Sequence, residues 1–213
     1  MPPPTTIPNL KPLLLAGGQS SRMGSAKFKM PFTDGKPLFW HLIQRLQEAC
    51  PHITTLYMSL HDPAQLSGVE LPSDTPIEMV YDEDDNSDFS DSVGPAAGLL
   101  AAHKKDPSAT WLVLACDYPL MNVSELVRLL EAYQEPLTCF ENAEGWSEPL
   151  VSIWGPEALK QLESNVRNGR LGPKNVVKAV GKTIRAGNEQ SLFNTNTRAE
   201  WERALEIARG KQT

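Results

Sequence analysis

The segment from Leu15 to Lys27 has residue types suited to holding phosphate groups. The residues concerned are Leu15, Ala16, Gly17, Gly18, Arg22 and Lys27. Glycines let backbone amides approach an anion because no Cβ stands in the way, and the two cations could neutralise charge that the amides cannot. The spacing excludes a P-loop, since Met23 stands five residues after Gly18, and it also excludes a GxGxxG fingerprint. A glycine-rich turn with incidental surface cations is the alternative.

Two aspartates follow apolar segments that have the composition of strands. Asp117 comes shortly after residues 111–115 and precedes a Tyr-Pro turn, which is a good position for an exposed carboxylate ligand. Asp82 comes after residues 78–81 and begins a segment, 82–91, in which six of the ten residues are Asp or Glu. That segment is typical of a solvated acidic loop, and a metal-linked role for Asp82 is the alternative interpretation.

A second run of small residues could also contact a ligand. Gly94, Pro95 and Gly98 open a predicted helix, where small side chains would let a base or ribose lie close to the backbone. A plain junction between a turn and a helix fits the same local pattern.

Polar residues near the carboxyl terminus complete the candidates. In an extended segment the side chains of Asn194 and Asn196 would point to the same face, so both amides could reach one ligand. The alternative is a strand end followed by capping of the last helix by Asn196 or Thr197. Arg170 could bind a phosphate of the acceptor, although a lone arginine in a loop is more often simply solvated.

Strand-like and helical patterns alternate along the chain, which predicts a mainly parallel sheet. Strands are predicted at residues 12–15, 55–60, 78–81, 111–115 and 150–154, and helices at 39–49, 124–133, 156–163 and 199–208. Asn122 or Ser124 is the expected N-cap of the second of these helices. The stretch 168–173, with its Gly and Pro residues, is predicted to be a loop.

Composition narrows the class of protein. The 213 residues fit a short flexible leader, residues 1–10, followed by a single domain over residues 11–213. A net charge of −6 disfavours binding to nucleic acid or to an anionic membrane, and no apolar run is long enough to span a bilayer. Three widely spaced cysteines, without a CxxC pair, argue against a disulfide framework or a zinc site, so a cytoplasmic location is expected.

Four short motifs together resemble those of the MobA-like nucleotidyltransferases, the family typified by molybdenum cofactor guanylyltransferase. The family's L-A-G-G-x-x-x-R-M-G-x-x-K is similar to the segment from Leu15 to Lys27, its G-P-L-A-G to Gly94-Pro95-Ala96-Ala97-Gly98, its C-D-x-P to Cys116-Asp117-Tyr118-Pro119, and its N-x-N-T to Asn194-Thr195-Asn196-Thr197. The motifs occur in the family's order and extend over almost the whole chain.

This resemblance implies an α/β fold, a three-layer αβα sandwich with a Rossmann-like, mostly parallel sheet of the nucleotide-diphospho-sugar transferase type. It also implies Mg²⁺ bound by Asp117, and transfer of GMP from GTP to the phosphate of molybdopterin or the molybdenum cofactor with release of pyrophosphate. Arg22, Lys27 and Asp117 would be catalytic, and Arg170, Asn194 and Asn196 would contact the acceptor. The nucleotide would contact Leu15, Ala16, Gly17, Gly18, Lys27, Ser59, Asp82, Gly94, Pro95, Gly98 and Asp117.

Some positions depart from the family's pattern. Ala26 stands where Asp commonly precedes the loop lysine, and Ala96 and Arg198 replace a common leucine and proline. Ser59 occupies the position of an asparagine that helps to recognise guanine in the family, and a shift of two residues would place His61 there instead. Gly17 favours GTP over CTP, because the cytidylyltransferases usually have L-A-A-G.

Three alternative functions follow from the same residues. The first is transfer of a cytidylyl or other nucleotidyl group to a different phosphorylated acceptor, and the second is a nucleotide-binding module without turnover. A dinucleotide-binding dehydrogenase is the third, and the absence of its fingerprint disfavours it.

Overall fold

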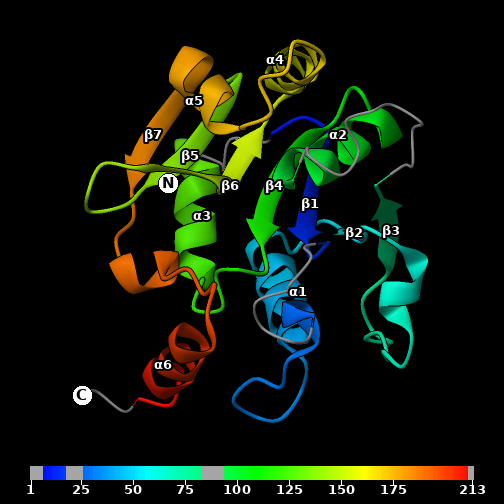
Figure 1. Ribbon diagram of the computed structural model, residues 1–213, viewed down its shortest axis with the longest axis vertical. Coiled ribbons are helices and arrows are strands. Elements are labelled where there is room, and N and C mark those ends of the chain that lie inside the picture. Colours follow the sequence, from blue (N-terminus) through cyan, green and yellow to red (C-terminus); the bar gives the residue numbers. More distant parts are fainter. Residues whose placement is uncertain (1–6, 18–25, 83–93, 211–213) are drawn as a thin grey trace.

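One seven-stranded sheet forms the centre of the protein, with strand order β3-β2-β1-β4-β6-β5-β7 (Figure 1). The computed structural model describes residues 7–17, 26–82 and 94–210. The strands are β1 (Leu10–Leu15), β2 (Leu56–Leu60), β3 (Ile77–Tyr81), β4 (Thr110–Ala115), β5 (Leu137–Glu141), β6 (Ser147–Trp154) and β7 (Gly181–Arg185). Strand β6 is antiparallel to both of its neighbours, and the other pairings are parallel.

Helices cover both faces of this sheet. They are α1 (Leu38–Ala49), α2 (Pro95–Lys105), α3 (Val123–Ala132), α4 (Pro156–Arg167) and α5 (Lys174–Val180), whereas α6 (Arg198–Ala208) lies beyond the carboxyl edge of the sheet (Figure 1). Helices α1 and α3 pack against each other, while α2 packs against α4 and α4 against α5. Because helices lie on both faces, every residue of β2 and β4 is buried. The α/β fold expected from the sequence is confirmed.

The predicted elements that carry motifs are present, with small shifts at their ends. Asn122 is the N-cap of α3, because its side chain accepts a hydrogen bond of 2.9 Å from the amide of Glu125. The sequence analysis missed β5, β7 and α5. Each has seven residues or fewer, and β7 lies at the edge of the sheet with polar residues in its sequence GKTIR, so its apolar pattern is weak.

The direction of the strands brings the motifs together. Leu15, at the end of β1, pairs with Ala115 of β4 on one side and Ser59 of β2 on the other, and Leu60 pairs with Tyr81 of β3. The segments that follow these four strands therefore start from one edge of the sheet, where open parallel sheets bind ligands.

A buried carboxylate holds the chain that leads to the last motif. Glu125 of α3 is 4% exposed and accepts hydrogen bonds from the amides of Gly187, at 3.0 Å, and Asn188, at 2.8 Å. The side chain of Asn122 also donates to the hydroxyl of Ser191 at 2.9 Å. Helix α3 thus sets the path by which residues 194–197 reach the carboxyl edge of the sheet.

No helix formed by the described residues is long and apolar enough to cross a membrane.

Candidate active site

The loop after β1 lies closely against the end of β2. The amide of Ala16 donates to the carbonyl of Ser59 at 2.9 Å, so the chain stays in register with β2 for one residue beyond the strand. A Cβ added at Gly17 would lie 2.7 Å from the backbone nitrogen of His61 and 2.9 Å from the carbonyl carbon of Leu60. Only glycine fits there, and the expected Gly18 and Arg22 contacts lie outside the described residues.

We expect Gly17→Ala to lower the free energy of unfolding by about 1–3 kcal/mol, because the new methyl group would meet backbone atoms that cannot rotate away. Gly172→Ala is the matched control, since a Cβ there would have only one neighbour, the side-chain nitrogen of Asn175 at 3.7 Å. Urea unfolding of the two variants measures the difference. Equal midpoints for both would contradict the close approach at Gly17.

The structure corrects the expectation for Ser59. Its side chain is 2% exposed and lies beneath α2, where a Cβ added at Gly98 would come within 2.6 Å of its hydroxyl oxygen. The hydroxyl therefore packs against Gly98 and does not face a base. Gly98 is needed for close packing of α2 on β2, which is a structural role at that position.

The start of α2 also requires glycine. Gly94 is the N-cap with φ of 57° and ψ of −136°, a conformation that side chains with a Cβ rarely adopt. Pro95 is at the first helical position, where its missing amide is no loss. Both features fit the junction between a turn and a helix, and contact of this segment with a nucleotide stays a prediction.

Asp82 and His61 lie together at the ends of β3 and β2. His61 Nδ1 is 3.5 Å from Asp82 Oδ2, and the histidine side chain is 41% exposed while that of the aspartate is 14% exposed. Asp82 Oδ1 is buried and has no hydrogen-bond partner among the described residues. Burial raises the pKa of Asp82, and the neighbouring His61 opposes that shift. A buried acceptor next to His61 with no partner among the described residues is the arrangement expected of a group that accepts hydrogen bonds from a ligand.

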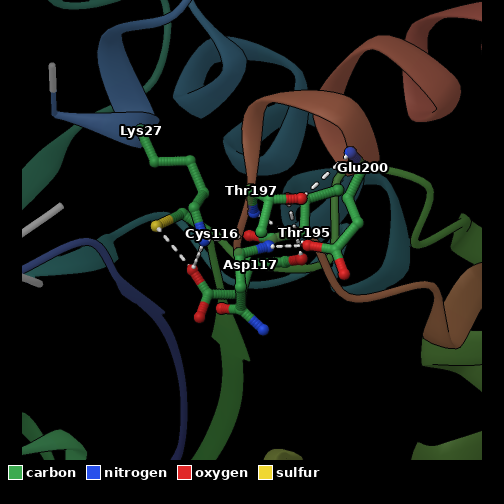
Figure 2. Close-up of polar contacts among 7 residues, drawn as sticks. Lys27, Cys116, Asp117, Thr195, Thr197 and Glu200 are labelled. Atoms are coloured by element: carbon green, nitrogen blue, oxygen red, sulfur yellow. Dashed lines mark hydrogen bonds and ion pairs between the residues drawn. The ribbon is translucent and has the colours of Figure 1, made fainter. Parts of the chain in front are cut away.

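Asp117 and Lys27 form an ion pair at the centre of the edge (Figure 2). The ammonium of Lys27, whose side chain is 7% exposed, lies 2.5 Å from Asp117 Oδ1, and it also donates to the carbonyl of Thr195. The short 3-10 helix η1 (Lys27–Lys29) sets the position of the lysine. One buried cation, that of Lys27, therefore joins η1 to the end of β4 and to the Asn-Thr-Asn-Thr segment. Neither of these two contacts was predicted from the sequence.

The Asn-Thr-Asn-Thr segment is fixed to Asp117 through the backbone. The amide of Thr195 donates to the carbonyl of Asp117 at 2.9 Å. Thr197 is the N-cap of α6, and the carboxylate of Glu200 accepts from the amides of Asn196 at 2.7 Å and Thr197 at 2.8 Å (Figure 2). The T-x-x-E spacing of a capping box could have revealed Glu200 from the sequence.

The two asparagines of this segment differ in their surroundings. Asn194 is half-buried, and its side-chain oxygen has no hydrogen-bond partner among the described residues, whereas Asn196 is exposed. Of the two N-caps proposed for α6, the structure uses Thr197. Contact of both amides with one ligand stays a prediction.

A chain of hydrogen bonds extends from Asp117 towards β6. The hydroxyl of Tyr118 donates to Glu148 Oε2 at 2.7 Å, and the side chain of Asn142 donates to Glu148 Oε1 at 3.1 Å. Burial, followed by the charge of Glu148, raises the pKa of Tyr118. The tyrosine is therefore a neutral hydrogen-bond donor that ties the residue after Asp117 to the start of β6.

The structure does not bring Arg170 to this site. The arginine is exposed in the connection between α4 and α5, and both helices lie at the amino end of β4, at the top of Figure 1, while Asp117 follows the opposite end of that strand. The expected contact of Arg170 with the acceptor is therefore not supported. A lone loop arginine at the surface is the interpretation that fits.

Asp117 suits a hard cation. Its side chain is 31% exposed, and Lys27 and Cys116 contact the carboxylate through Oδ1. The described residues contain no cluster of three or more His, Cys, Asp or Glu side chains that could hold a metal ion. A single carboxylate completed by phosphate oxygens and water is a common arrangement for Mg²⁺.

Comparison with known proteins gives one family. Residues 12–187 match the model of the MobA-like NTP transferase domain. A molybdenum cofactor biosynthesis bifunctional protein from Synechocystis is 32% identical over 159 residues, which are 73% of this chain but 42% of that longer protein. A probable molybdenum cofactor guanylyltransferase from Rhodopirellula baltica is 27% identical over 92% of this chain and 88% of its own length.

A solved structure shows the same fold. The molybdopterin-guanine dinucleotide biosynthesis protein A from Archaeoglobus fulgidus superposes with a TM-score of 0.67, at 19% identity, over 94% of this chain and 99% of that one.

Proposed function

The chain belongs to the MobA-like NTP transferase family and is a nucleotidyltransferase, and from this premise we propose that it transfers GMP from GTP to the terminal phosphate of molybdopterin or its molybdenum form. The relatives named as molybdenum cofactor guanylyltransferases support this choice of substrates. The observation that carries the proposal is the junction of Lys27, Asp117 and Thr195, which unites three of the four motifs at one point.

The reaction needs no protein nucleophile, because the acceptor phosphate is already anionic. An oxygen of that phosphate attacks the α-phosphorus of GTP, a new P–O–P linkage forms, and the bond from the α-phosphorus to the bridging oxygen of the β-phosphate breaks. Pyrophosphate leaves with the bonding electrons. The protein's contribution is to align the two phosphates and to offset their charge.

Different residues would contact different phosphate groups of the substrates. Asp117 presents a carboxylate beside the α-phosphate, where Mg²⁺, when bound, would supply further stabilisation of the negative charge. Lys27 provides a buried cation at the same point, and the amides of the loop after β1, together with Arg22, would hold the leaving phosphates. The burial of Cys116 raises the pKa of its thiol, so this neighbour of Asp117 is not a nucleophile.

The base would lie on the side of β2 and β3. Asp82 Oδ1 lacks a partner among the described residues, and a guanine edge offers two adjacent N–H donors to such a carboxylate. This arrangement and the glycine at position 17 support GTP as the substrate. Residues 11–213 are proposed as one catalytic domain, and a cytoplasmic location stays a prediction.

We expect GTP to be used in preference to CTP, and Asp82→Asn to reduce this preference about tenfold or more. A hydrogen bond to a charged group contributes about 1.5–3 kcal/mol, and the substitution removes the charge while replacing one acceptor by a donor. The measurement is competition between the two triphosphates at equal concentration with Mg²⁺ present.

The control for this experiment is Asp74→Asn, since Asp74 is exposed in the loop before β3. Its selectivity should equal that of the wild type. A wild-type preference for CTP would overturn the guanylyl assignment, and an unchanged preference in Asp82→Asn would show that this carboxylate does not contact the base.

The substrates are tested together by offering four nucleoside triphosphates against several phosphorylated acceptors and identifying products by mass. GTP with molybdopterin should give the guanine dinucleotide and pyrophosphate, and a chelator should stop the reaction. Nucleotide binding without a product in any combination would instead indicate a binding module.

A further inference from the structure

The order of the strands separates the two substrates. Gly17, together with His61 and Asp82, lies at the edge on the β2 and β3 side of Asp117. In nucleotidyl transfer the attacking and leaving oxygens lie roughly in line on opposite sides of the phosphorus. With the proposed function as its premise, this in-line geometry places the non-phosphate part of the acceptor on the other side of β4, over β6 and β5.

The hairpin that joins β5 to β6 lies on that side and carries an exposed aromatic residue. Because β6 is antiparallel to β4, its first residues stand at the carboxyl edge, and the hairpin projects at the left of Figure 1. Trp146 immediately precedes β6 and is 60% exposed. Among the large apolar side chains in the described part of the chain, Leu71 and Val180 are the other exposed ones, and neither is aromatic.

The backbone of the hairpin holds Trp146 firmly. The amide of Trp146 donates to the side-chain oxygen of Asn142 at 3.0 Å, and its carbonyl accepts from the amide of Asn142 at 2.9 Å. Glu189 also accepts from the amide of Ala143 at 3.2 Å, which ties the hairpin to the 3-10 helix η4 (Glu189–Leu192). An exposed indole on a rigid support loses little entropy when a ring stacks on it.

The hairpin is coupled to the reaction centre through hydrogen bonds. Asn142 donates to Glu148, which accepts from Tyr118, the residue after Asp117. Trp146 and Glu148 are two positions apart, so an extended chain directs both side chains to the same face. The indole therefore belongs to the surface that continues from Asp117 over β6.

We propose that Trp146 is the stacking platform for the planar heteroaromatic ring of the phosphorylated acceptor. The pyrimidine ring of the pterin is planar, and a tryptophan face binds such rings by stacking. Binding there would leave the acceptor phosphate directed back towards Asp117. Trp146 determines acceptor affinity and takes no part in binding GTP.

The kinetic test compares Trp146→Ala, Trp146→Leu and Trp146→Phe with the wild type, using molybdopterin and saturating GTP. Removal of a stacking aromatic side chain weakens base binding by about 1–3 kcal/mol, which is roughly 5- to 150-fold. Trp146→Ala and Trp146→Leu should therefore raise the KM for molybdopterin about tenfold, while Trp146→Phe stays within about threefold. The KM for GTP should not change. Leu71→Ala, which removes an exposed apolar side chain elsewhere, is the control.

A second measurement does not depend on turnover. Of the five tryptophans, Trp111, Trp154 and Trp201 are fully buried, and Trp40 is partly buried with its indole N–H donating to the carbonyl of Glu70. Quenching of tryptophan emission by bound molybdopterin should therefore come mainly from Trp146, which is 60% exposed. Trp146→Phe should lose most of the quenching seen in the wild type. Equal quenching in both proteins, or an unchanged molybdopterin KM in Trp146→Ala, would overturn the proposal. If the wild type forms no dinucleotide at all, the proposed function fails, and the quenching experiment still decides the role of Trp146.

Discussion

Asp117→Asn should reduce nucleotidyl transfer by about a thousandfold or more. The substitution removes the negative charge that would hold Mg²⁺ at the α-phosphate, and metal-ion stabilisation of such transition states contributes several kcal/mol. The change in volume is negligible, so the backbone contacts between Asp117 and Thr195 should remain. The measurement is pyrophosphate release at saturating GTP and molybdopterin over a range of Mg²⁺ concentrations.

The fold of this variant needs a separate measurement, because Asp117 is also the ion-pair partner of Lys27. The amide oxygen that replaces Oδ1 can still accept a hydrogen bond from the buried ammonium of Lys27, and the side chain of Asp117 is 31% exposed. We therefore expect a loss of about 1 kcal/mol in the free energy of unfolding, well below the cost of breaking a fully buried pair. Asp74→Asn serves as the control for both activity and stability. Full Mg²⁺-dependent activity in Asp117→Asn would rule out Asp117 as the metal ligand.

Lys27→Met should have the second largest effect. We expect it to lower kcat/KM for GTP roughly 10- to 150-fold, which corresponds to a loss of about 1.5–3 kcal/mol of transition-state stabilisation. Methionine fills a similar volume in the buried site but removes the cation that lies against Asp117 and Thr195. Arg22→Ala should weaken the use of the triphosphate by a similar amount, since it removes a second cation from the same loop. Steady-state kinetics with GTP as the varied substrate gives both values.

A double-mutant cycle separates the two roles of Lys27. In the ion pair, each single substitution leaves its partner without its counter-charge, so Lys27→Met combined with Asp117→Asn should destabilise less than the sum of the two changes. The activity of the double variant should be no higher than that of Asp117→Asn alone. Additive losses in stability would show that the pair does not form in solution, and unchanged GTP kinetics in both Lys27→Met and Arg22→Ala would place the phosphate site elsewhere.

Local patterns in the sequence were sufficient to predict the central elements and the place of Asp117 directly after a strand, whereas the structure shows its side chain only partly exposed. The run TWLVLA is apolar on both faces, as a strand between two helical layers must be, and a charged residue, Asp117, follows it closely. The helix over residues 38–49 was equally predictable, because Leu42, Ile43 and Leu46 recur at helical spacing and are all buried. These features depend on residues a few positions apart.

The contacts of Lys27 could not be predicted in the same way. Its acceptor at Thr195 is 168 residues further along the chain. The backbone hydrogen bond from Thr195 to Asp117 and the contacts of Glu125 with residues 187 and 188 hold that segment in place. The sequence analysis assigned Lys27 to phosphate and Asp117 to metal as separate roles. Tertiary packing decided that the two side chains contact each other.

Ser59 and Arg170 show which site assignments the sequence could not make. Strand β2 is buried along its whole length, so its residues do not alternate between polar and apolar, and nothing in LYMSL shows which side chains a ligand could reach. Packing of α2 through Gly98 covers Ser59, and the next exposed side chain on that path is His61. Arg170 lies in a loop whose location depends on the antiparallel β6, which carries the chain to the amino end of the sheet before α4 begins. The sequence by itself therefore determined the family's motifs and the strands that hold them, because both depend on residues close together in the chain. The direction of β6 and the covering of β2 by α2 depend on long-range packing, which only the tertiary structure decides.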